Sequence, residues 1–430
     1  LTALHDGYFP SAYGQRLPAG HGTPIQVTED SNFFTELRLR HQGAITGRVL
    51  DENGVPVPEV QIYAYRARLP LRSAGIATSD DRGVYRIHGL SPGKYWVRSA
   101  PHTFDDSSSW LPTFGPQGRE VRDARVHPLS VEIDAQDADV SPEPGALFHL
   151  GGTIACDRDG REGAVTITLS SETGRQRIGG SCNDQYRFDH LAPGYYEILA
   201  TTLDGKAAGF SEMFLDRDSE VGVVQVMQLS STRVDVYRAG SSVRMPPVTL
   251  IGRRQDLSET DSPREFKSPS LMLAPGNWAF RAIPPAGLCV DSISTGSPRR
   301  PLQVEHDPDW YEVFIQQRGF VPIRVMLSDQ CGQIRGQVLS EGKPSVAAPV
   351  FLWPLKESAR RALSGPQQAL TDTEGHFQFS GLPPGDYRLV ASFDINEIDE
   401  ELIELSHAIT VTAVPNQSAS ADLQVWTAPF

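Results

Sequence analysis

Leu90-Ser-Pro92-Gly93-Lys-Tyr95 is the first of four copies of the phrase Leu-x-Pro-Gly-x-aromatic in this 430-residue chain. The phrase returns as Leu191-Ala-Pro193-Gly194-Tyr-Tyr196, as Leu273-Ala-Pro275-Gly276-Asn-Trp278 and as Leu382-Pro-Pro384-Gly385-Asp-Tyr387. Successive glycines are 101, 82 and 109 residues apart, which is about one small domain each. Chance does not place four residue types at fixed offsets four times, so the chain is a repeat.

Each phrase predicts a turn between two strands, because proline fixes φ at the first central position and glycine supplies φ > 0 at the next. Tyr85 and Ile87 alternate with polar residues before the first copy, and the same alternation reaches Val97 after it. An alternating strand buries one face and exposes the other. Ahead of the third copy, Ser268 and Ser270 take the apolar positions, so we expect a short or irregular strand there.

Other strand patterns recur in the same order around each turn. An early strand and a second strand come before it, and closing strands come after it. Many short strands with Gly and Pro turns are typical of β-sandwiches. Helix patterns are confined to residues 356–363 and 397–405. The sequence therefore predicts an all-β tandem array of four sandwiches, at residues 43–145, 146–232, 233–329 (the divergent copy) and 330–430.

Residues 1–42 fit this pattern as the tail of a preceding repeat. Tyr8-Phe-Pro10-Ser resembles Trp110-Leu-Pro112-Thr late in the first unit, and residues 25–27 and 37–39 match its closing strands. A half-unit exposes unpaired strand edges that must be covered. Two explanations stay open: strand donation from a neighbouring molecule, which builds filaments head to tail, or the remnant of a longer chain.

Ile45-Thr-Gly47-Arg-Val49 and Asp80-Asp-Arg-Gly83-Val-Tyr85, followed by the Pro-Gly turn, resemble a carboxypeptidase regulatory-like domain. The fourth unit repeats these motifs as Gly336-Gln-Val338 and Asp372-Thr-Glu-Gly375-His-Phe377. The resemblance implies immunoglobulin-like, transthyretin-like sandwiches, close to collagen-binding-protein B-type domains, in a secreted or surface protein of bacteria. It implies no catalytic activity, because this module is named for its position beside an enzyme.

Two departures from the family's wider pattern limit what the resemblance implies. None of the eleven histidines has Glu three residues on, so the zinc site of the carboxypeptidase catalytic domain is not expected. No early strand contains lysine, so the Lys–Asn cross-link of the B-type domains is not expected either.

The four cysteines fall at related places in two units. Cys156 ends an early strand and Cys182 starts the strand before the second turn; these strands lie close together in such a sandwich, so we expect a disulfide between them. Cys289 follows the third turn and Cys331 opens the fourth unit, and a bond between them would tie the end of the third unit. Four cysteines allow three connectivities, and reduced, buried thiols remain the alternative. Disulfides would imply an oxidising compartment outside the cell.

Composition excludes several classes of protein. The net charge is −14, and nucleic-acid binding needs clustered Lys and Arg, so no nucleic-acid partner is expected. The sequence contains no run of 18 apolar residues, so no transmembrane helix is predicted. No serine-hydrolase, zinc-protease, Walker or dinucleotide motif occurs, so we expect no enzyme and no cofactor. The acidic turns 51–54, 80–83, 157–160 and 372–375 are interpreted as turn chemistry and not as metal sites.

Exposed aromatic side chains are the remaining candidates for ligand or partner contact. Trp96 is next to the inward-facing Tyr95, so alternation turns it outward. Flat rings stack on polysaccharide, but they also pack between neighbouring units or subunits. The candidates are Trp96, Trp110, Trp310, Tyr311, Trp353 and Trp426.

These observations predict a non-catalytic, extracellular structural protein. It would be a rod of β-sandwiches that acts by shape, as a homo-oligomer, a filament or a surface appendage. The alternative is a set of adhesin-type modules that bind carbohydrate or other surface proteins.

Overall fold

The computed structural model describes residues 1–15, 22, 25, 32–67, 71, 73–105, 108–129, 134–156, 163–172, 174–257, 261–267, 269–295, 309–317, 321–395 and 398–427. In these ranges strands dominate, and the α-helices are the short α1 (Glu357–Leu363) and α2 (Glu400–Leu405). The all-β, tandem-sandwich fold predicted from the sequence is confirmed. Both helices lie within the regions where helix patterns were predicted.

The first and fourth units share one strand plan. In the first unit one sheet pairs β3 (Gly43–Arg48) with β6 (Val84–Leu90), and the other has the order β10 (His127–Leu129), β7 (Gly93–Ser99), β4 (Gln61–Arg66) and β5 (Ser73–Thr78). In the fourth unit one sheet has the order β27 (Lys343–Pro344), β26 (Gly332–Ser340) and β30 (His376–Leu382), and β33 (Ser418–Ser420) and β34 (Leu423–Gln424) also pair with β26. The other sheet has the order β29 (Gln367–Leu370), β28 (Pro349–Pro354), β31 (Gly385–Ala391) and β32 (Ile409–Ala413).

The second and third units vary this plan. In the second unit the two halves join in one sheet, β13 (Gly174–Ser181), β12 (Ala164–Ser171), β15 (Gly194–Thr202), β16 (Ala207–Leu215), β17 (Ser219–Gln228), β11 (Phe148–Cys156) and β14 (Gln185–Leu191). In the third unit one sheet has the order β21 (Ser270–Met272), β18 (Ser231–Arg238), β25 (Ile323–Ser328) and β23 (Cys289–Thr295). The other has the order β20 (Arg264–Phe266), β19 (Thr249–Gln255), β22 (Gly276–Ile283) and β24 (Tyr311–Ile315). The short strand expected ahead of the third turn is confirmed, because β20 and β21 have three residues each.

Each Pro-Gly turn is a corner between the two halves of its sandwich. β6 pairs with β3, whereas β7, directly after the turn, pairs with β4 and β10. The leucine of each phrase is buried. The aromatic residue donates a hydrogen bond to the carbonyl four residues earlier, at Tyr95–Ser91 (2.6 Å), Tyr196–Ala192 (2.7 Å), Trp278–Ala274 (2.9 Å) and Tyr387–Pro383 (2.6 Å).

The turn glycines follow the expectation of positive φ in three of four copies. Gly93, Gly276 and Gly385 have φ of 150°, 116° and 157°, whereas Gly194 lies outside the positive region. A side chain at Gly93 would also meet the guanidinium of Arg66, which lies 2.1 Å from the ideal Cβ position. The phrase therefore fixes the corner through the buried leucine and the aromatic hydrogen bond more consistently than through glycine.

The early strand of each unit is covered by a closing segment that runs parallel to it. β11 pairs in parallel with β17, β18 with β25, and β26 with β33 and β34. In the first unit the same pairing is reduced to two bridges, Ile45–Ala135 and Val49–Val140. Each of the four described units thus contains its own closing segment and its own buried core.

Residues 1–15 and 32–42 repeat the backbone bonding found at the end of the first unit, where β8 (His102–Asp105) pairs with β9 (Ser108–Trp110). Phe9 N donates to Arg40 O in the same way as Leu111 N donates to Glu143 O. Gln42 N donates to Gly7 O in the same way as Gly145 N donates to Ser109 O. The likeness of these segments therefore extends from sequence to structure. The strand predicted at 37–39 does not form, and the strands in the described part of this segment are β1 (Thr2–Ala3) and β2 (Ser11–Ala12). Of the other predicted strand, at 25–27, residues 26–27 lie outside the described residues.

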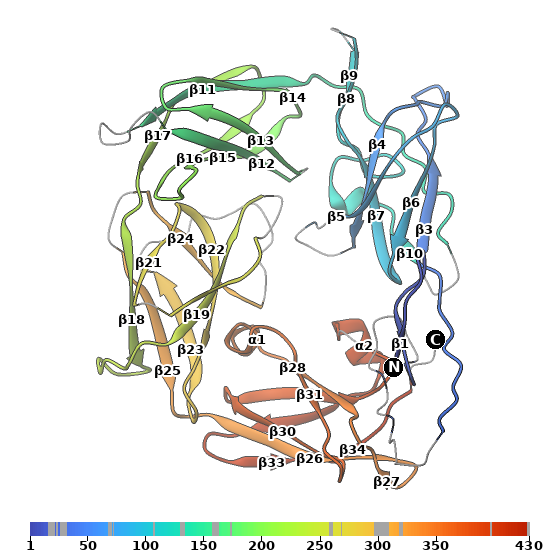
Figure 1. Ribbon diagram of the computed structural model, residues 1–430, viewed down its shortest axis with the longest axis vertical. Coiled ribbons are helices and arrows are strands. Elements are labelled where there is room, and N and C mark those ends of the chain that lie inside the picture. Colours follow the sequence, from blue (N-terminus) through green and yellow to red (C-terminus); the bar gives the residue numbers. More distant parts are fainter. Residues whose placement is uncertain are drawn as a thin grey trace.

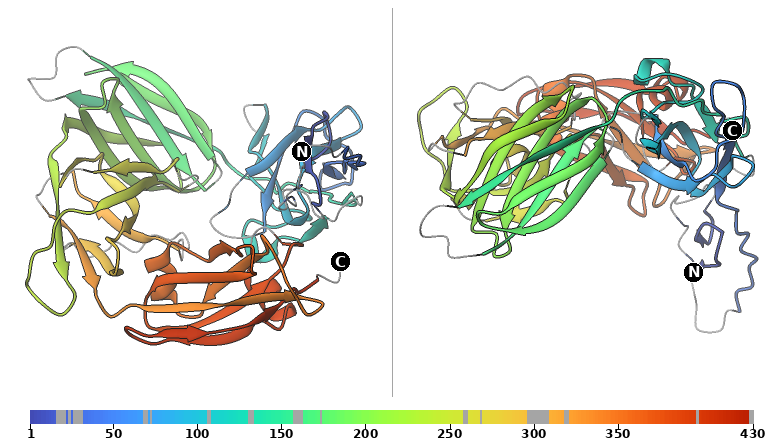
Figure 2. Two further views of the ribbon diagram at one scale, coloured as in Figure 1. Left: turned by 60° about the horizontal axis from the view of Figure 1, so that its bottom comes forward. Right: turned by 90° about the horizontal axis from the view of Figure 1, so that it is seen from above.

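The four sandwiches follow one another around a curve. In Figure 1 the chain runs from the first unit (blue) through the second (green) and third (yellow) to the fourth (orange to red), which returns to the side of the first. The views in Figure 2 show the same curved order. The rod predicted from the sequence is therefore wrong in shape. A repeat defines its units, but the contacts at each junction set the angle between them.

Candidate functional site: the junctions between the sandwiches

Charged side chains are buried where the second and third units meet. The Asp256 side chain, directly after β19, has no exposed surface. It accepts hydrogen bonds from Ser170 Oγ of β12 at 2.7 Å and from Arg175 Nε of β13. Arg175 Nη1 also lies 3.2 Å from Asp261 Oδ1, and Arg254 Nη1 lies 3.7 Å from Asp256 Oδ2. Charge pairs therefore cross from one sandwich to the next.

Glu197 on β15 lies in the same junction with only 2% of its surface exposed. Asn277 of β22 donates to its Oε1 at 3.3 Å. Burial raises the pKa of Glu197 to about 7, and the negative charges of Asp256 and Glu212 act in the same direction. Arg254 and the Asn277 hydrogen bond act against them. The carboxyl of Glu197 thus titrates near neutral pH.

Aromatic and amide contacts complete this junction. The rings of Phe210 on β16 and Phe314 on β24 are 6.0 Å apart in an edge-on arrangement. Gln317 donates to the Gln225 carbonyl at 2.5 Å and accepts from the Phe210 amide at 3.3 Å. Only two residues separate the end of β17 from the start of β18. Two residues extend over at most about 7 Å, so the linker holds the two units side by side.

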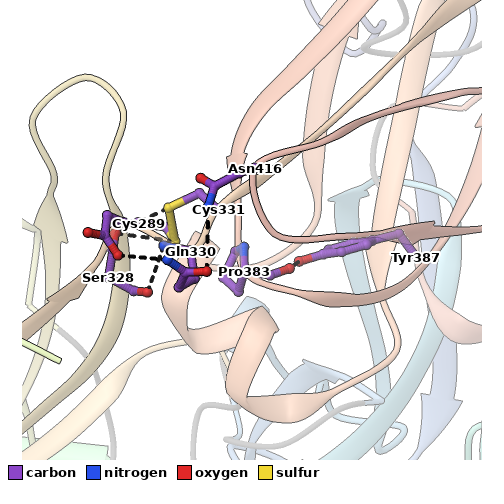
Figure 3. Close-up of a disulfide and its surroundings, with 8 residues drawn as sticks. Cys289, Ser328, Gln330, Cys331, Pro383, Tyr387 and Asn416 are labelled. Atoms are coloured by element: carbon purple, nitrogen blue, oxygen red, sulfur yellow. Dashed lines mark hydrogen bonds between the residues drawn. A yellow bond between two sulfur atoms is a disulfide. The ribbon is translucent and has the colours of Figure 1, made fainter. Parts of the chain in front are cut away.

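A disulfide stands at the junction between the third and fourth units. Cys289 begins β23 and is joined to Cys331, which lies in the three-residue connection between β25 and β26. Figure 3 shows the bond beside Gln330 and Asn416. Asn416 N donates to Cys331 O at 2.9 Å, and its side-chain amide donates to Gln330 Oε1 at 3.4 Å. The connection is therefore tied to the third unit by sulfur and to the fourth by hydrogen bonds.

Helix α1 of the fourth unit packs against the third unit at the same junction. Ala362 contacts the hydrophobic core of the third unit. Arg360 Nη2 lies 3.2 Å from Asp309 Oδ1, and the Arg360 guanidinium lies 4.6 Å above the Trp353 ring. The helix therefore meets the third unit through Ala362 and the Arg360–Asp309 ion pair, while the cation–π contact holds Arg360 against its own unit.

The first junction buries an arginine. Arg98 on β7 is 8% exposed, and its guanidinium lies 4.7 Å above the Phe114 ring. Burial lowers the pKa of Arg98, while Tyr65 of its own unit and Glu172 and Tyr196 of the second unit oppose this shift. The field of the second unit thus reaches into the first.

The other predicted disulfide, Cys156–Cys182, lies inside the second unit. Cys156 at the end of β11 is joined to Cys182, and no free cysteine remains. Cys182 lies in the turn between β13 and β14, whereas the sequence placed it at the start of a strand. The structure contains both cysteine pairs that the sequence analysis favoured.

The aromatic candidates do not form a common site. Trp310, Tyr311 and Trp353 are buried, so the structure corrects their expected availability to a ligand. The guanidinium groups of Arg253 and Arg281 both contact the Trp310 ring, at 4.1 and 5.1 Å from its centre. The half-buried candidates are Trp96, Trp110, which packs on the first core, and Trp426, which packs near α2.

The acidic turns hold their own backbone. The carboxylate of Asp80 accepts from the amides of Arg82 and Val84, and that of Asp372 accepts from the amides of Glu374 and His376. The bond from the Val84 amide is the largest cause that lowers the pKa of Asp80, and the bond from the His376 amide is the largest cause that lowers the pKa of Asp372. Asp51 bonds its turn in the same way, whereas turn 157–160 lies outside the described residues.

The described residues hold no group of three or more His, Cys, Asp or Glu side chains arranged to bind a metal ion. No described helix is long and apolar enough to cross a bilayer.

Sequence reasoning missed Glu197, Arg254 and Asp256. Strand alternation turns Glu197 away from the core of its own sandwich, where a charged residue is expected to meet solvent. Nothing in the repeat shows that the neighbouring sandwich covers this face. The run Arg253-Arg254-Gln255-Asp256, unusually polar for a strand, is the signal that could have found the junction.

Comparison with known proteins identifies part of the chain. Residues 44–122 match the family model of the carboxypeptidase regulatory-like domain. The resemblance seen in the motifs is thereby confirmed for the first unit. No curated protein matches the chain in sequence.

Solved structures from bacteria show distant likenesses. The TIE protein of Bacillus anthracis is 10% identical, with a TM-score of 0.19, over 93% of this chain and 75% of that one. The major pilin subunit of Bacillus cereus is 9% identical, with a TM-score of 0.18, over 89% and 99%. A streptococcal ancillary pilin is 12% identical, with a TM-score of 0.20, over 67% and 99%. At these TM-scores the likenesses support no argument about function.

Proposed function

We propose that this chain is a non-catalytic, extracellular structural protein that holds four β-sandwiches in a fixed, curved array. The units are residues 43–145, 146–232, 233–329 and 330–430, and residues 1–42 form a segment that resembles the end of the first unit. The observation that carries the proposal is the Cys289–Cys331 disulfide at a junction between units. It ties together two sandwiches that a short connection and α1 already bring into contact.

Domains joined in one chain move relative to one another unless their interface is large or cross-linked. Here the connections after β17 and β25 have two and three residues. Buried ion pairs cross the one junction and a disulfide closes the other. Disulfides persist in oxidising compartments, which supports a location outside the cell.

The proposal is tested by the oxidation state of the protein purified from its native source. Iodoacetamide added in urea is expected to modify no cysteine before reduction and four cysteines after it, and peptide mapping is expected to give the pairs 156–182 and 289–331. Free thiols at Cys289 and Cys331 in the native material would contradict the proposal.

Self-association into oligomers or filaments is the finer part of this proposal. Donation of a strand onto β3, β11, β18 or β26 is not supported, because the structure pairs each of them with its own closing segment. Contact through strands at the ends of their sheets, such as β5 and β29, is another route. Sedimentation velocity over a hundred-fold range of concentration tests it, since an assembly grows with concentration and a monomer does not.

A second candidate function is binding of carbohydrate or of other surface proteins. It is favoured by an exposed aromatic pair on the second unit, Tyr195 and Phe214, which are 42% and 53% exposed with ring centres 4.8 Å apart. Glycan-array binding that is lost in Tyr195→Ala or Trp110→Ala, and kept in Val243→Ala on the third unit, would support this alternative. Binding that none of the substitutions changes would oppose it.

A further inference from the structure

The junction between the second and third units buries an acid that its surroundings do not neutralise. Glu197 Oε2 has no hydrogen-bond partner among the described residues, and only the Asn277 amide is bonded to Oε1. A buried carboxylate that lacks such partners is costly in free energy, and a protonated carboxyl does not have this cost. The site therefore suits the neutral form of Glu197.

The charges around Glu197 are balanced without it. The groups that act on Glu197 are Glu212 on β16, Arg254 on β19, Asp256 after β19 and Asn277 on β22. Asp256 is bonded in turn to Ser170 on β12 and Arg175 on β13, and Arg175 also pairs with Asp261. The guanidinium groups of Arg175 and Arg254 meet two aspartates, the buried Asp256 and the half-buried Asp261, so an ionised Glu197 adds a third negative charge to two positive ones. Glu212, its partner on the adjacent strand, adds further repulsion.

We propose that this junction is a pH-sensitive hinge, closed when Glu197 carries a proton and loosened when Glu197 is ionised. Arg175 pairs with both aspartates, whereas Glu197 Oε2 has no hydrogen-bond partner among the described residues, so Glu197 is the group on which the hinge depends. The hinge goes beyond the structural role proposed above, because it makes one angle of the curved array depend on pH.

The sign of the pH effect follows from the raised pKa. Burial raises the pKa of Glu197 from 4.5 to about 7 in the closed junction, and an opened junction returns it toward 4.5. The closed state therefore binds the proton more tightly. Its advantage is complete below about pH 4.5 and is lost as the pH rises through about 7. Over this interval the opening equilibrium shifts by up to about two orders of magnitude toward the open state.

Single-molecule energy transfer on the full chain tests the hinge. Dyes are placed at Leu203→Cys in the second unit and Val243→Cys in the third, which are both well exposed, while the native cysteines stay in disulfides. The distance distribution is expected to be narrow at pH 5 and broader at pH 8.5. Glu197→Gln, which keeps the shape and removes the charge, is expected to stay narrow at both. An unchanged wild-type distribution, or the same broadening in Glu197→Gln, would overturn the hinge.

A matched control and a direct titration complete the experiment. Glu265→Gln, on the exposed part of β20, is expected to respond to pH like the wild type. In the wild type labelled with 13C at glutamate Cδ, one carboxyl resonance is expected to titrate near pH 7, and titration of every glutamate near 4.5 would overturn the proposal without any variant. A negative result here leaves the disulfide test of the structural role unaffected, so the two failures are distinguishable.

Discussion

Tyrosine or tryptophan, and not phenylalanine, ends each of the four turn phrases. The structure gives the reason, because the ring is buried while its polar atom donates to the carbonyl of the residue before proline. A buried carbonyl without a donor costs about 1–3 kcal/mol. The residue type therefore follows from one backbone group at the corner of each sandwich.

Tyr387→Phe tests this at the fourth corner (Figure 3). It removes the bond to the Pro383 carbonyl and leaves the ring in place, so we expect the fourth unit to lose about 1 kcal/mol of stability. Hydrogen exchange of the β30 and β31 amides in the full chain measures the loss. Tyr195→Phe, at the exposed ring next to Tyr196, is the control because Tyr196 and not Tyr195 makes the corner bond of the second unit. Equal exchange in both variants would contradict the role of the bond.

At the scale of elements, glycine in the early strand permits the closing segment to approach. An ideal Cβ at Gly47 would lie 2.2 Å from the Ala138 carbonyl oxygen, and one at Gly336 would lie 1.7 Å from that of Ala421. These carbonyl oxygens belong to the backbone, which cannot move aside for an added Cβ as the end of a flexible side chain can. The Gly-x-Val motif of the first and fourth units is thus explained by the parallel pairing of the early strand.

Gly336→Ala is therefore expected to push the closing segment off β26. Overpacking of this kind costs about 1–3 kcal/mol, and hydrogen exchange at β33 and β34 is expected to rise with it. Gly222→Ala on β17 is the matched control, because nothing lies within 4 Å of an added Cβ there. Two equally stable variants would show that the approach is not tight.

The two disulfides are expected to differ in effect because they act on different elements. Cys156–Cys182 closes a loop of 26 residues inside the second unit, so its loss in a double Ser variant should cost about 3–4 kcal/mol of that unit's stability. Loss of Cys289–Cys331 should instead loosen the junction between the third and fourth units. Urea unfolding followed by exchange in each unit separates the two effects, and equal destabilisation of all units by either variant would contradict this assignment.

At the scale of the whole molecule, the sequence predicted the units better than their arrangement. Leu90, Pro92, Gly93 and Tyr95 and their three counterparts act within one sandwich, so a local pattern is enough to identify them. Glu197 and Asp256 act between sandwiches, and the alternation that turns a residue away from one core does not show what lies beyond it. The curve of the array and the charged junction therefore needed the structure.

Curvature also changes how the chain would present itself to partners. In a straight rod, every sandwich offers its outer faces equally, whereas here the fourth unit returns to the side of the first (Figures 1 and 2). The junction contacts that bend the array also cover faces that strand alternation would leave to solvent. Partners are therefore expected on the faces and edges away from the junctions.

Small-angle X-ray scattering of the full, oxidised chain at pH 5 tests the central claim of a fixed, curved array most directly. The account predicts one scattering curve that the closed arrangement of Figure 1 reproduces without an ensemble of conformations. A curve that requires a straight rod, or a mixture of extended and bent chains, would contradict it.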